Sequence, residues 1–122
     1  MLHYVAFSEL STIKAAVVDR VIVEASFTAI CPLTKTVDEY NVTIEYVPNE
    51  EGVYVELESL RKYLDSFKGV EIFHEDLAAE LVRKLAKVVK PRYLSVRLRS
   101  RFLGMYVTVI KELKDPHRSG AV

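Results

Sequence analysis

The sequence predicts a single α+β domain, in which an antiparallel sheet carries two helices on one face. Three observations support this fold class. Segments rich in β-branched residues occupy the first and last parts of the 122-residue chain, two helical patterns lie between them, and short polar connections join these segments. With 50% hydrophobic and 28% charged residues the chain can fold around a core, and no shift in composition marks a domain boundary within residues 1–122.

The first half of the chain predicts two strands and a short extended segment. Residues 17–30 are rich in β-branched side chains and partly alternate, which indicates a long strand. Residues 38–41 are polar and predict a connection. Residues 42–47 predict a second strand, which ends at the turn-forming residues 48–52. Residues 53–56 are a short extended segment that leads into a helix.

Two helices are expected in the middle of the chain. Apolar residues recur at helical spacing across residues 58–67 and predict the first helix. The second begins at His74 or Glu75 and continues to about Val89, because its first turn is acidic, its last turn is basic, and Pro91 follows. The resulting order of two strands, two helices and two strands is the basis of the α+β prediction.

The last two strands are predicted over residues 93–102 and 105–113, joined at Gly104. In the first of them, arginines alternate with apolar or small residues, so that period two places three guanidinium groups on one face of the sheet. These arginines are Arg97, Arg99 and Arg101. Two interpretations remain open: a solvated face balanced by neighbouring acidic groups, or contact with phosphate, which suits the planar guanidinium group.

The net charge of zero conceals a strong asymmetry. Residues 1–82 hold 15 Asp and Glu against 6 Lys and Arg, whereas residues 83–122 hold 11 Lys and Arg against 2 Asp and Glu. This asymmetry predicts a polyanion partner for the basic part, complementary packing between subunits, or both. The N-terminal residues show neither a signal peptide nor a membrane span, and one cysteine cannot form an internal disulfide, so a cytoplasmic protein is expected.

The candidate chemistry centres on Cys31, the only cysteine, which ends an apolar run and is followed by Asp38. A His74-Glu75 pair lies at the expected start of the second helix. A thiol, a carboxyl and a His–Glu pair can support covalent chemistry on a small electrophile. A buried core cysteine and an ordinary helix N-terminus would explain the same residues. The spacing of Cys31 and the three histidines does not indicate a metal site.

Taken together, several segments resemble the 7-cyano-7-deazaguanine reductase (QueF) family. They are residues 27–34, Asp38, residues 42–48, residues 63–67 and residues 73–76. The resemblance covers roughly residues 20–80. It implies the tunnelling fold, in which small α+β subunits assemble side by side into a barrel with active sites at the subunit interfaces. It also implies a homo-oligomer, built as pentamers stacked into a decamer.

The resemblance also implies roles for individual residues. Cys31 corresponds to the nucleophile that attacks a nitrile carbon and forms a thioimide, and Asp38 to the acid that protonates the nitrogen. Glu75 corresponds to the carboxylate that hydrogen-bonds to the guanine-like edge of the base, with His74 beside it in the pocket. A further base-contacting segment matches Val55, Glu56 and Leu57.

The sequence departs from the reductases in the segments they use for NADPH and for close approach to a ligand. Their motif reads Glu-Ser-Lys-Ser-Leu-Lys, whereas residues 56–61 read Glu-Leu-Glu-Ser-Leu-Arg, so that Glu58 replaces a lysine that meets cofactor phosphate. Their Arg-Gly-Gly run corresponds to Arg101-Phe102-Leu103-Gly104. A chain that keeps the covalent machinery without the NADPH motif resembles the archaeal QueF-like branch. Those amidinotransferases add ammonia to 7-cyano-7-deazaguanine in tRNA and form archaeosine.

The resemblance therefore implies a tRNA-modifying amidinotransferase that uses ammonia and no cofactor. Its candidate contacts to tRNA phosphate are Lys90, Arg97, Arg99 and Arg101, with Lys84, Lys87 and Arg92 extending the positive surface. Two alternatives remain open. One is an NADPH-dependent nitrile reductase of queuosine biosynthesis, for which Glu58→Lys is the informative change. The other is a non-catalytic module that binds tRNA.

Overall fold

The computed structural model describes residues 9–114 and has the predicted α+β class. The strands are β1 (Thr12–Lys14), β2 (Val21–Ile30), β3 (Val37–Val47), β4 (Val53–Val55), β5 (Tyr93–Phe102) and β6 (Met105–Lys114), and the helices are α1 (Leu57–Asp65) and α2 (His74–Val89). Residues 1–8 and 115–122, which include His3 and His117, lie outside the described residues. No helix within residues 9–114 is both long and apolar enough to cross a membrane.

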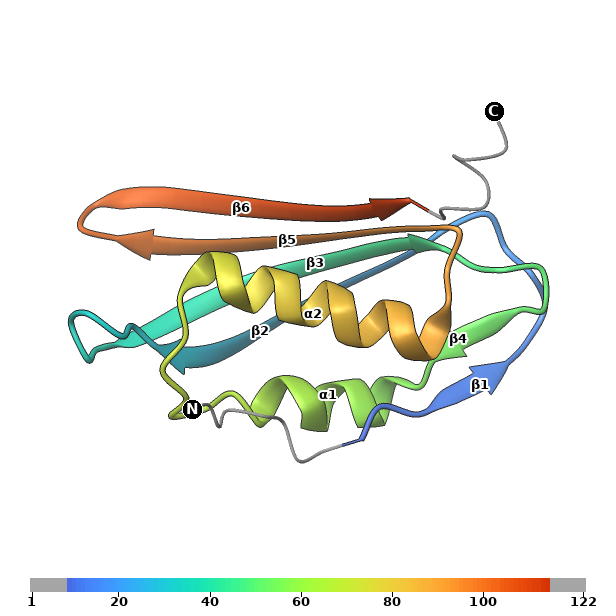
Figure 1. The fold of residues 1–122 in the computed structure, drawn as a ribbon, viewed down its shortest axis with the longest axis horizontal. Coiled ribbons are helices and arrows are strands. Elements are labelled where there is room, and N and C mark those ends of the chain that lie inside the picture. The colour runs from blue at the N-terminus through green and yellow to red at the C-terminus, as the bar shows by residue number, and fades with distance from the viewer. Residues whose placement is uncertain (1–8, 115–122) are drawn as a thin grey trace.

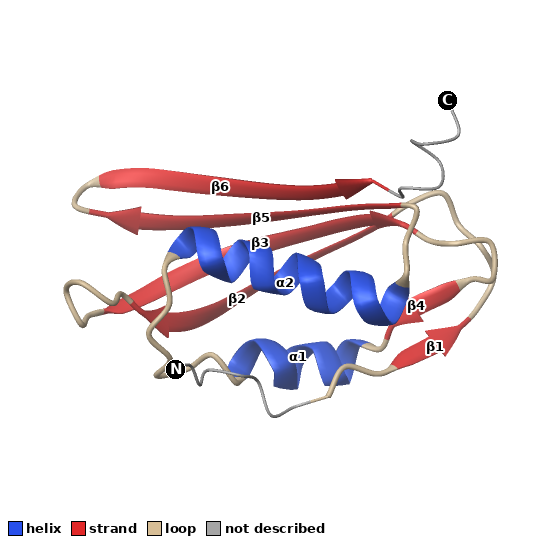
Figure 2. Ribbon diagram, in the orientation of Figure 1, coloured by secondary structure: helices blue, strands red, loops and turns tan. Residues whose placement is uncertain are grey.

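Four strands form the main sheet in the order β2-β3-β5-β6, and every neighbouring pair is antiparallel. Strands β1 and β4 form a separate two-stranded sheet at one end of the molecule (Figure 1). Both helices lie on the same side of the main sheet, and Figure 2 shows its other side without a helix. The prediction of an antiparallel sheet with two helices on one face is therefore confirmed.

Alternation along β3 explains which face of the sheet is buried. Asp38, Tyr40, Val42, Ile44 and Tyr46 are each at most 4% exposed, and they point toward the helices. The intervening residues are exposed or half-buried, as period two requires. The leucine stripe of α2 packs onto this face and supplies much of the core, with Leu77, Leu81 and Leu85 fully buried.

Three of the predicted element boundaries are wrong. Residues 38–41 belong to β3 and are not a connection, because β2 and β3 pair without interruption from Val21–Tyr46 to Ile30–Val37. Their connection is the turn of residues 31–36. Residues 17–20 are not part of β2, and α1 ends at Asp65, two residues before its predicted end. Strand β1 was not predicted, since its three residues carry little local signal and pair with the distant β4.

Two left-handed residues shape the hairpin that joins β5 and β6. Leu103 has φ of 53° and Gly104 has φ of 76°, between the paired residues Phe102 and Met105. Positive φ at both positions is the conformation of a two-residue type I′ turn, whose twist matches that of the strands. This hairpin brings Phe102 and Leu103 to the end of the sheet at which β2 meets β3 through the 31–36 turn (Figure 1).

Candidate active site

A cavity of about 400 Å³ brings together four of the residues selected from the sequence, Cys31, Asp38, His74 and Glu75. They come from three elements: the end of β2, the start of β3, and the first turn of α2. The cavity is completed by mostly apolar residues of the 31–36 turn, the residue before α2 and the β5–β6 hairpin. They are Pro32, Leu33, Thr34, Phe73, Phe102 and Leu103. No group of His, Cys, Asp and Glu suited to hold a metal ion occurs in residues 9–114.

Backbone hydrogen bonds hold Cys31 beside the start of α2. The N–H of Ile30 donates to the carbonyl of Val70 over 2.8 Å, and the N–H of Ile72 donates to the carbonyl of Ile30 over 3.1 Å. An ion pair of 2.8 Å between Lys35 and Glu71 joins the same two segments. The end of β2 and the residues before α2 are therefore attached to each other, which places the thiol next to the His74-Glu75 pair.

Asp38 is a buried carboxyl group at the centre of this arrangement, with only 4% of its surface exposed. The hydroxyl of Tyr40 donates to its Oδ2 atom over 3.3 Å, and Nε2 of His74 lies 3.5 Å from the same oxygen. Within residues 9–114 the other oxygen, Oδ1, has no hydrogen-bond partner among the protein groups. Asp38 therefore has one oxygen with two polar neighbours and one without a hydrogen-bond partner among the described residues.

The turn around Cys31 favours the thiolate form of its side chain. Cys31 is 9% exposed, its N–H donates to the carbonyl of Thr36, and its own carbonyl accepts from the N–H of Lys35. The Thr34 hydroxyl, followed by the N–H groups of Thr34 and Leu33, lowers the pKa of the Cys31 thiol, while burial and the charge of Asp38 oppose this shift. A lowered pKa places the nucleophilic thiolate within a lower pH range than an ordinary cysteine reaches.

Replacing Thr34 by valine should move the ionisation of Cys31 to higher pH. The substitution keeps the shape of the side chain and removes the hydroxyl that contributes most to the lowered pKa. The rate of alkylation of Cys31 by iodoacetamide, followed against pH, measures this, since the chain has no other thiol. Thr43→Val, on the exposed face of β3, is the matched control and should leave the midpoint unchanged. A midpoint that is equal in Thr34→Val and wild type would show that the hydroxyl does not hold the thiolate.

Sequence reasoning did not assign roles to several residues of the cavity. Thr34 belongs to the segment of the resemblance, but its spacing from Cys31 does not show that a turn will direct the hydroxyl at the sulfur. Tyr40 was placed in a connection, although the alternation Tyr40, Val42, Ile44, Tyr46 could have extended the strand. Leu103 is 79% exposed and comes from a hairpin that is distant in sequence, so no local signal links it to the site.

A single chain does not bring the other proposed substrate-binding segment to this cavity. Val55, Glu56 and Leu57 lie at the start of α1, beside β4, whereas Cys31 lies at the opposite end of the sheet (Figure 1). Glu56 is the N-cap of α1 and accepts hydrogen bonds of 2.8 Å from the N–H groups of Glu58 and Ser59, which lower the pKa of its carboxyl group. Val55 is buried, and Leu57 is 60% exposed.

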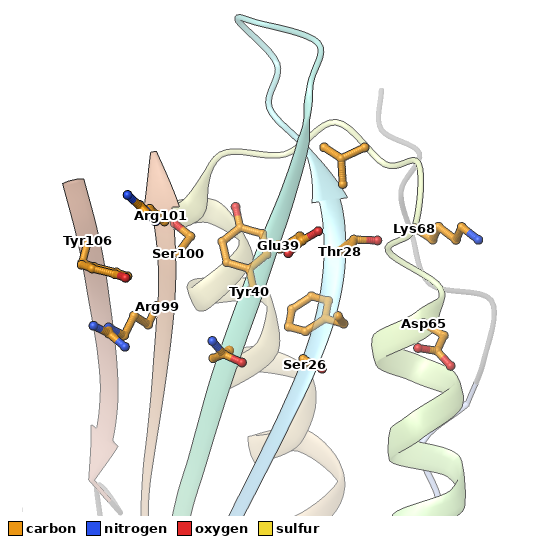
Figure 3. A pocket seen from close by; sticks show the side chains of 13 residues that line it. Ser26, Thr28, Glu39, Tyr40, Asp65, Lys68, Arg99, Ser100, Arg101 and Tyr106 are labelled. Carbon is orange, nitrogen blue, oxygen red and sulfur yellow. The ribbon is translucent and has the colours of Figure 1, made fainter. Parts of the chain in front are cut away.

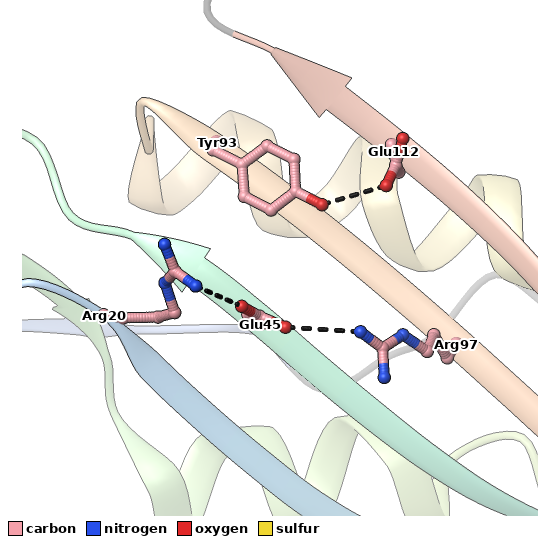
Figure 4. A network of polar contacts seen from close by, with 5 residues as sticks. All are labelled: Arg20, Glu45, Tyr93, Arg97 and Glu112. Carbon is pink, nitrogen blue, oxygen red and sulfur yellow. Dashed lines mark hydrogen bonds and ion pairs between the residues drawn. The ribbon is translucent and has the colours of Figure 1, made fainter.

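The three alternating arginines lie exposed on the helix-free side of the sheet, as predicted. Arg97 is 3.4 Å from Glu45 of β3, which also pairs with Arg20 over 3.1 Å (Figure 4). The charge of Arg97 is thus balanced by a neighbouring carboxylate, as the solvated-face interpretation expects. Within residues 9–114, Arg99 and Arg101 have no carboxylate partner, and both stack on the Tyr106 ring, with guanidinium-to-centroid distances of 4.2 and 5.6 Å.

Arg99 and Arg101 also line a hollow of about 940 Å³, larger than the cavity at Cys31, which extends from these strands to the end of α1 (Figure 3). Figure 3 shows the hollow between β6 and the end of α1, with Lys68 and the acidic Asp65 and Glu39 also lining it. The larger hollow has no cysteine, and the thiol lies in the smaller cavity. Lys90 does not join these arginines, because it follows α2 at the opposite end of β5 from Arg101.

Comparison with known proteins shows which family this chain belongs to. A family model described as QueF-like protein matches residues 38–113. The archaeosine synthase of Pyrobaculum calidifontis is 39% identical over 84 residues, covering 69% of this chain and 75% of that protein. The NADPH-dependent 7-cyano-7-deazaguanine reductase of Alkalilimnicola ehrlichii is 36% identical over 91 residues, covering 74% and 69%. The crystal structure of the apo archaeosine synthase QueF-Like superposes with a TM-score of 0.74 at 35% identity, covering 80% of this chain and 94% of that one.

Proposed function

The chain belongs to the QueF-like protein family, and from this membership we propose that it is an archaeosine synthase. In this role it is an amidinotransferase that converts the nitrile of 7-cyano-7-deazaguanine in tRNA to an amidine. The observation that carries the proposal is the shared cavity of Cys31 and Asp38, in a chain whose sequence and fold are both similar to archaeosine synthases. The relatives that are reductases support a nitrile substrate as well.

The first chemical step uses Cys31 and Asp38. The Cys31 thiolate attacks the nitrile carbon, a C–S bond forms, and one π-bond of the nitrile becomes a lone pair on nitrogen. The carboxyl group of Asp38 delivers a proton to that nitrogen through its unpartnered oxygen, which leaves a neutral thioimide and a carboxylate. The lowered pKa of Cys31 supports this assignment, because the thiolate is the attacking species.

The second step needs ammonia and no hydride. Ammonia adds to the thioimide carbon, and a proton passes from the new nitrogen to the Asp38 carboxylate. The tetrahedral adduct then collapses, the C–S bond breaks, and the thiolate of Cys31 leaves with its electron pair. The product carries C(=NH)NH₂ in place of C≡N, and the sum of the two steps is the addition of one ammonia to the nitrile.

Recognition of the base is assigned to two groups of residues. His74 and Glu75 lie in the cavity, and the Glu75 carboxylate can accept two hydrogen bonds from the guanine-like edge of the base. Val55, Glu56 and Leu57 are distant from Cys31 in the same chain, so they reach the base only if they come from a neighbouring subunit. We therefore place the complete site between two copies of this chain.

Two features of the fold support assembly into a homo-oligomer, which we propose to be pentamers stacked as a decamer. Strands β2 and β6 each have one neighbour in the main sheet, so each leaves an edge of ten residues available for pairing. The acidic and basic parts of the chain are also complementary. Strand β2 belongs to the part with 15 acidic and 6 basic residues, and β6 to the part with 11 basic and 2 acidic residues.

The decisive experiment incubates the protein with ammonium and tRNA that carries 7-cyano-7-deazaguanine, without NADPH. The tRNA is then digested and its nucleosides are measured by mass spectrometry. An archaeosine synthase produces a nucleoside heavier by one ammonia. If the nitrile persists, NADPH and the free base are added. Reduction to the amine would establish the reductase alternative, whereas no reaction in either case would leave the non-catalytic tRNA-binding module.

The substrate class implies that tRNA contacts the protein beyond the modified base. The candidate phosphate contacts are Lys90, Arg97, Arg99 and Arg101. Among the three arginines, Arg99 and Arg101 are the stronger candidates, because Arg97 shares Glu45 with Arg20. A guanidinium group stacked on Tyr106 keeps its donors directed outward from the ring edge, where they can meet phosphate oxygens.

The double substitution Arg99→Ala/Arg101→Ala should weaken binding of the modified tRNA and reduce its salt dependence. Each lost phosphate contact lowers the slope of log Kd against log salt concentration by about 0.7 to 0.9, so a decrease of about 1.5 is expected. Fluorescence anisotropy over a series of salt concentrations measures the slope. Arg61→Ala/Arg83→Ala is the control, since it removes two exposed arginines from the helices. An unchanged slope in the test variant would restore the solvated-face interpretation.

A further inference from the structure

Tyr40 contacts both Asp38 and His74, and the proposed mechanism gives it no role. It is two residues from Asp38 in β3, so the pleat directs both side chains to the helix-covered face. Its hydroxyl donates to Oδ2 of Asp38 over 3.3 Å, and 1% of its surface is exposed. Figure 3 shows the Tyr40 ring beside β3, with its hydroxyl directed toward the start of that strand, which follows the 31–36 turn.

The ring of Tyr40 is fixed from two sides. Phe27 of β2 stacks on it with a centroid distance of 5.5 Å, and the His74 ring meets it edge-on at 5.3 Å and 89°. Aromatic contacts of this geometry restrict the ring and so determine where the hydroxyl lies. The same ring also supports His74, whose Nε2 is 3.5 Å from the oxygen that accepts from Tyr40.

The surroundings of Tyr40 favour the protonated form of its phenol. Burial, the charge of Asp38 and the hydrogen bond to it raise the pKa of the phenol far above its usual value, with smaller contributions from Cys31 and Glu75. The hydroxyl therefore stays protonated and donates its hydrogen bond to Asp38, so that this carboxyl group is the route by which Tyr40 can act on the reaction.

We propose that Tyr40 is a positioning residue that holds Oδ2 of Asp38, so that Oδ1 faces the cavity and delivers the proton to the substrate nitrogen. This inference rests on the proposed function and extends it. A carboxyl group can rotate about its Cβ–Cγ bond, and either oxygen could then face the substrate. The hydrogen bond from the Tyr40 hydroxyl to Oδ2, with His74 Nε2 placed 3.5 Å from the same oxygen, restricts that rotation, and the second oxygen has no hydrogen-bond partner within residues 9–114. Holding a reacting group in one orientation is a recognised source of rate enhancement.

The test is the substitution Tyr40→Phe, which removes the hydroxyl and retains the ring packing on Phe27 and His74. We expect kcat for amidine formation on tRNA to fall about 10- to 100-fold, as for a reacting group that is no longer held in place, while KM for tRNA changes less than about twofold. The pH dependence of kcat should also change, because the hydrogen bond that Tyr40 makes to the acidic group is lost.

Two comparisons separate this role from a structural one. Tyr93→Phe removes another tyrosine hydroxyl that donates to a carboxylate, Glu112 at 2.9 Å, at the other end of the sheet, and should not change kcat (Figure 4). In an Asp38→Asn background, Tyr40→Phe should have little further effect, since a residue that acts only through Asp38 loses its target. Additive losses in the double variant would overturn the inference.

The outcomes also separate this inference from the proposed function. If wild type forms the amidine and Tyr40→Phe has the wild-type kcat and pH profile, the positioning role is wrong and the function stands. If wild type forms no amidine, the rate of thioimide formation with free 7-cyano-7-deazaguanine, followed by intact mass, replaces the first readout. A slower adduct in Tyr40→Phe then supports the positioning role, and an equal rate or no adduct in wild type overturns it.

Discussion

Cys31→Ala should abolish both the covalent adduct with 7-cyano-7-deazaguanine and the formation of amidine on tRNA. The thiolate is the proposed attacking group, and within residues 9–114 no other thiol exists to replace it. We expect the rate of amidine formation to fall about 10⁴-fold or more, the scale on which the loss of a catalytic nucleophile acts. Intact-mass spectrometry detects the adduct, and nucleoside analysis of the tRNA measures the product.

Three further measurements show whether the loss of activity comes from the loss of the thiol rather than from unfolding or weaker binding of tRNA. Thermal unfolding of Cys31→Ala should resemble that of wild type, because one sulfur atom is removed at a site beside an existing cavity. Cys31→Ser should be inactive as well, since a serine hydroxyl does not ionise as a thiol does at neutral pH. Binding of the modified tRNA should persist in both variants. An adduct that still forms in Cys31→Ala would assign the nucleophile to another side chain.

Asp38→Asn should produce the second largest loss, about 10²- to 10⁴-fold in kcat, which is the range of general acid–base catalysis. Asparagine has the shape of aspartate, and the Tyr40 hydroxyl can still donate to its carbonyl oxygen, so the side chain should stay in place. It can no longer release a proton to the nitrile nitrogen. The rate of thioimide formation, measured in a single turnover without ammonia, isolates the step that depends on this proton.

Asp65→Asn is the matched control for this substitution. Asp65 lies on α1, is exposed, and pairs with Arg61 over 2.7 Å, outside the cavity around Cys31. Its substitution removes one carboxylate from the chain without changing the reacting groups, so kcat should stay within about twofold of wild type, since surface ion pairs contribute little. A wild-type rate of thioimide formation in Asp38→Asn would move the acid role to another group, such as His74, whose Nε2 lies 3.5 Å from Asp38.

The helices and the last hairpin were predictable because their signals are local. The apolar stripe of α2, its charged ends and Pro91 all lie within the segment they define, and the structure confirms its bounds. The start of β3 was missed for the opposite reason. Asp38 occupies an inward position where alternation leads one to expect an apolar residue, and a buried carboxyl in that position interrupts the pattern. The interruption coincides with the candidate catalytic acid.

The candidate site also contains some residues that sequence motifs identify and others that only the folded structure shows. Cys31, Asp38, His74 and Glu75 were found through motifs that keep their order along the chain, and the structure places all four around one cavity. The hydroxyl of Tyr40 and that of Thr34 could not be assigned, because their directions depend on pairing and turn geometry that arise only in the folded chain. Leu103 enters the site through a hairpin some seventy residues after Cys31, a distance that no local pattern spans.

The attachment of Ile30 to Val70 and Ile72 has a consequence for the order in which the protein matures. Those two backbone hydrogen bonds close a chain segment of roughly forty residues, and closure of such a segment must overcome the entropy of the intervening chain. During synthesis, the strand that carries the thiol leaves the ribosome well before α2 does. A nascent chain at that stage has an exposed cysteine without the helix that supplies its substrate contacts. The thiol and the His74-Glu75 pair therefore come together only on tertiary closure, and under the proposed function the complete site also needs a second copy of the chain.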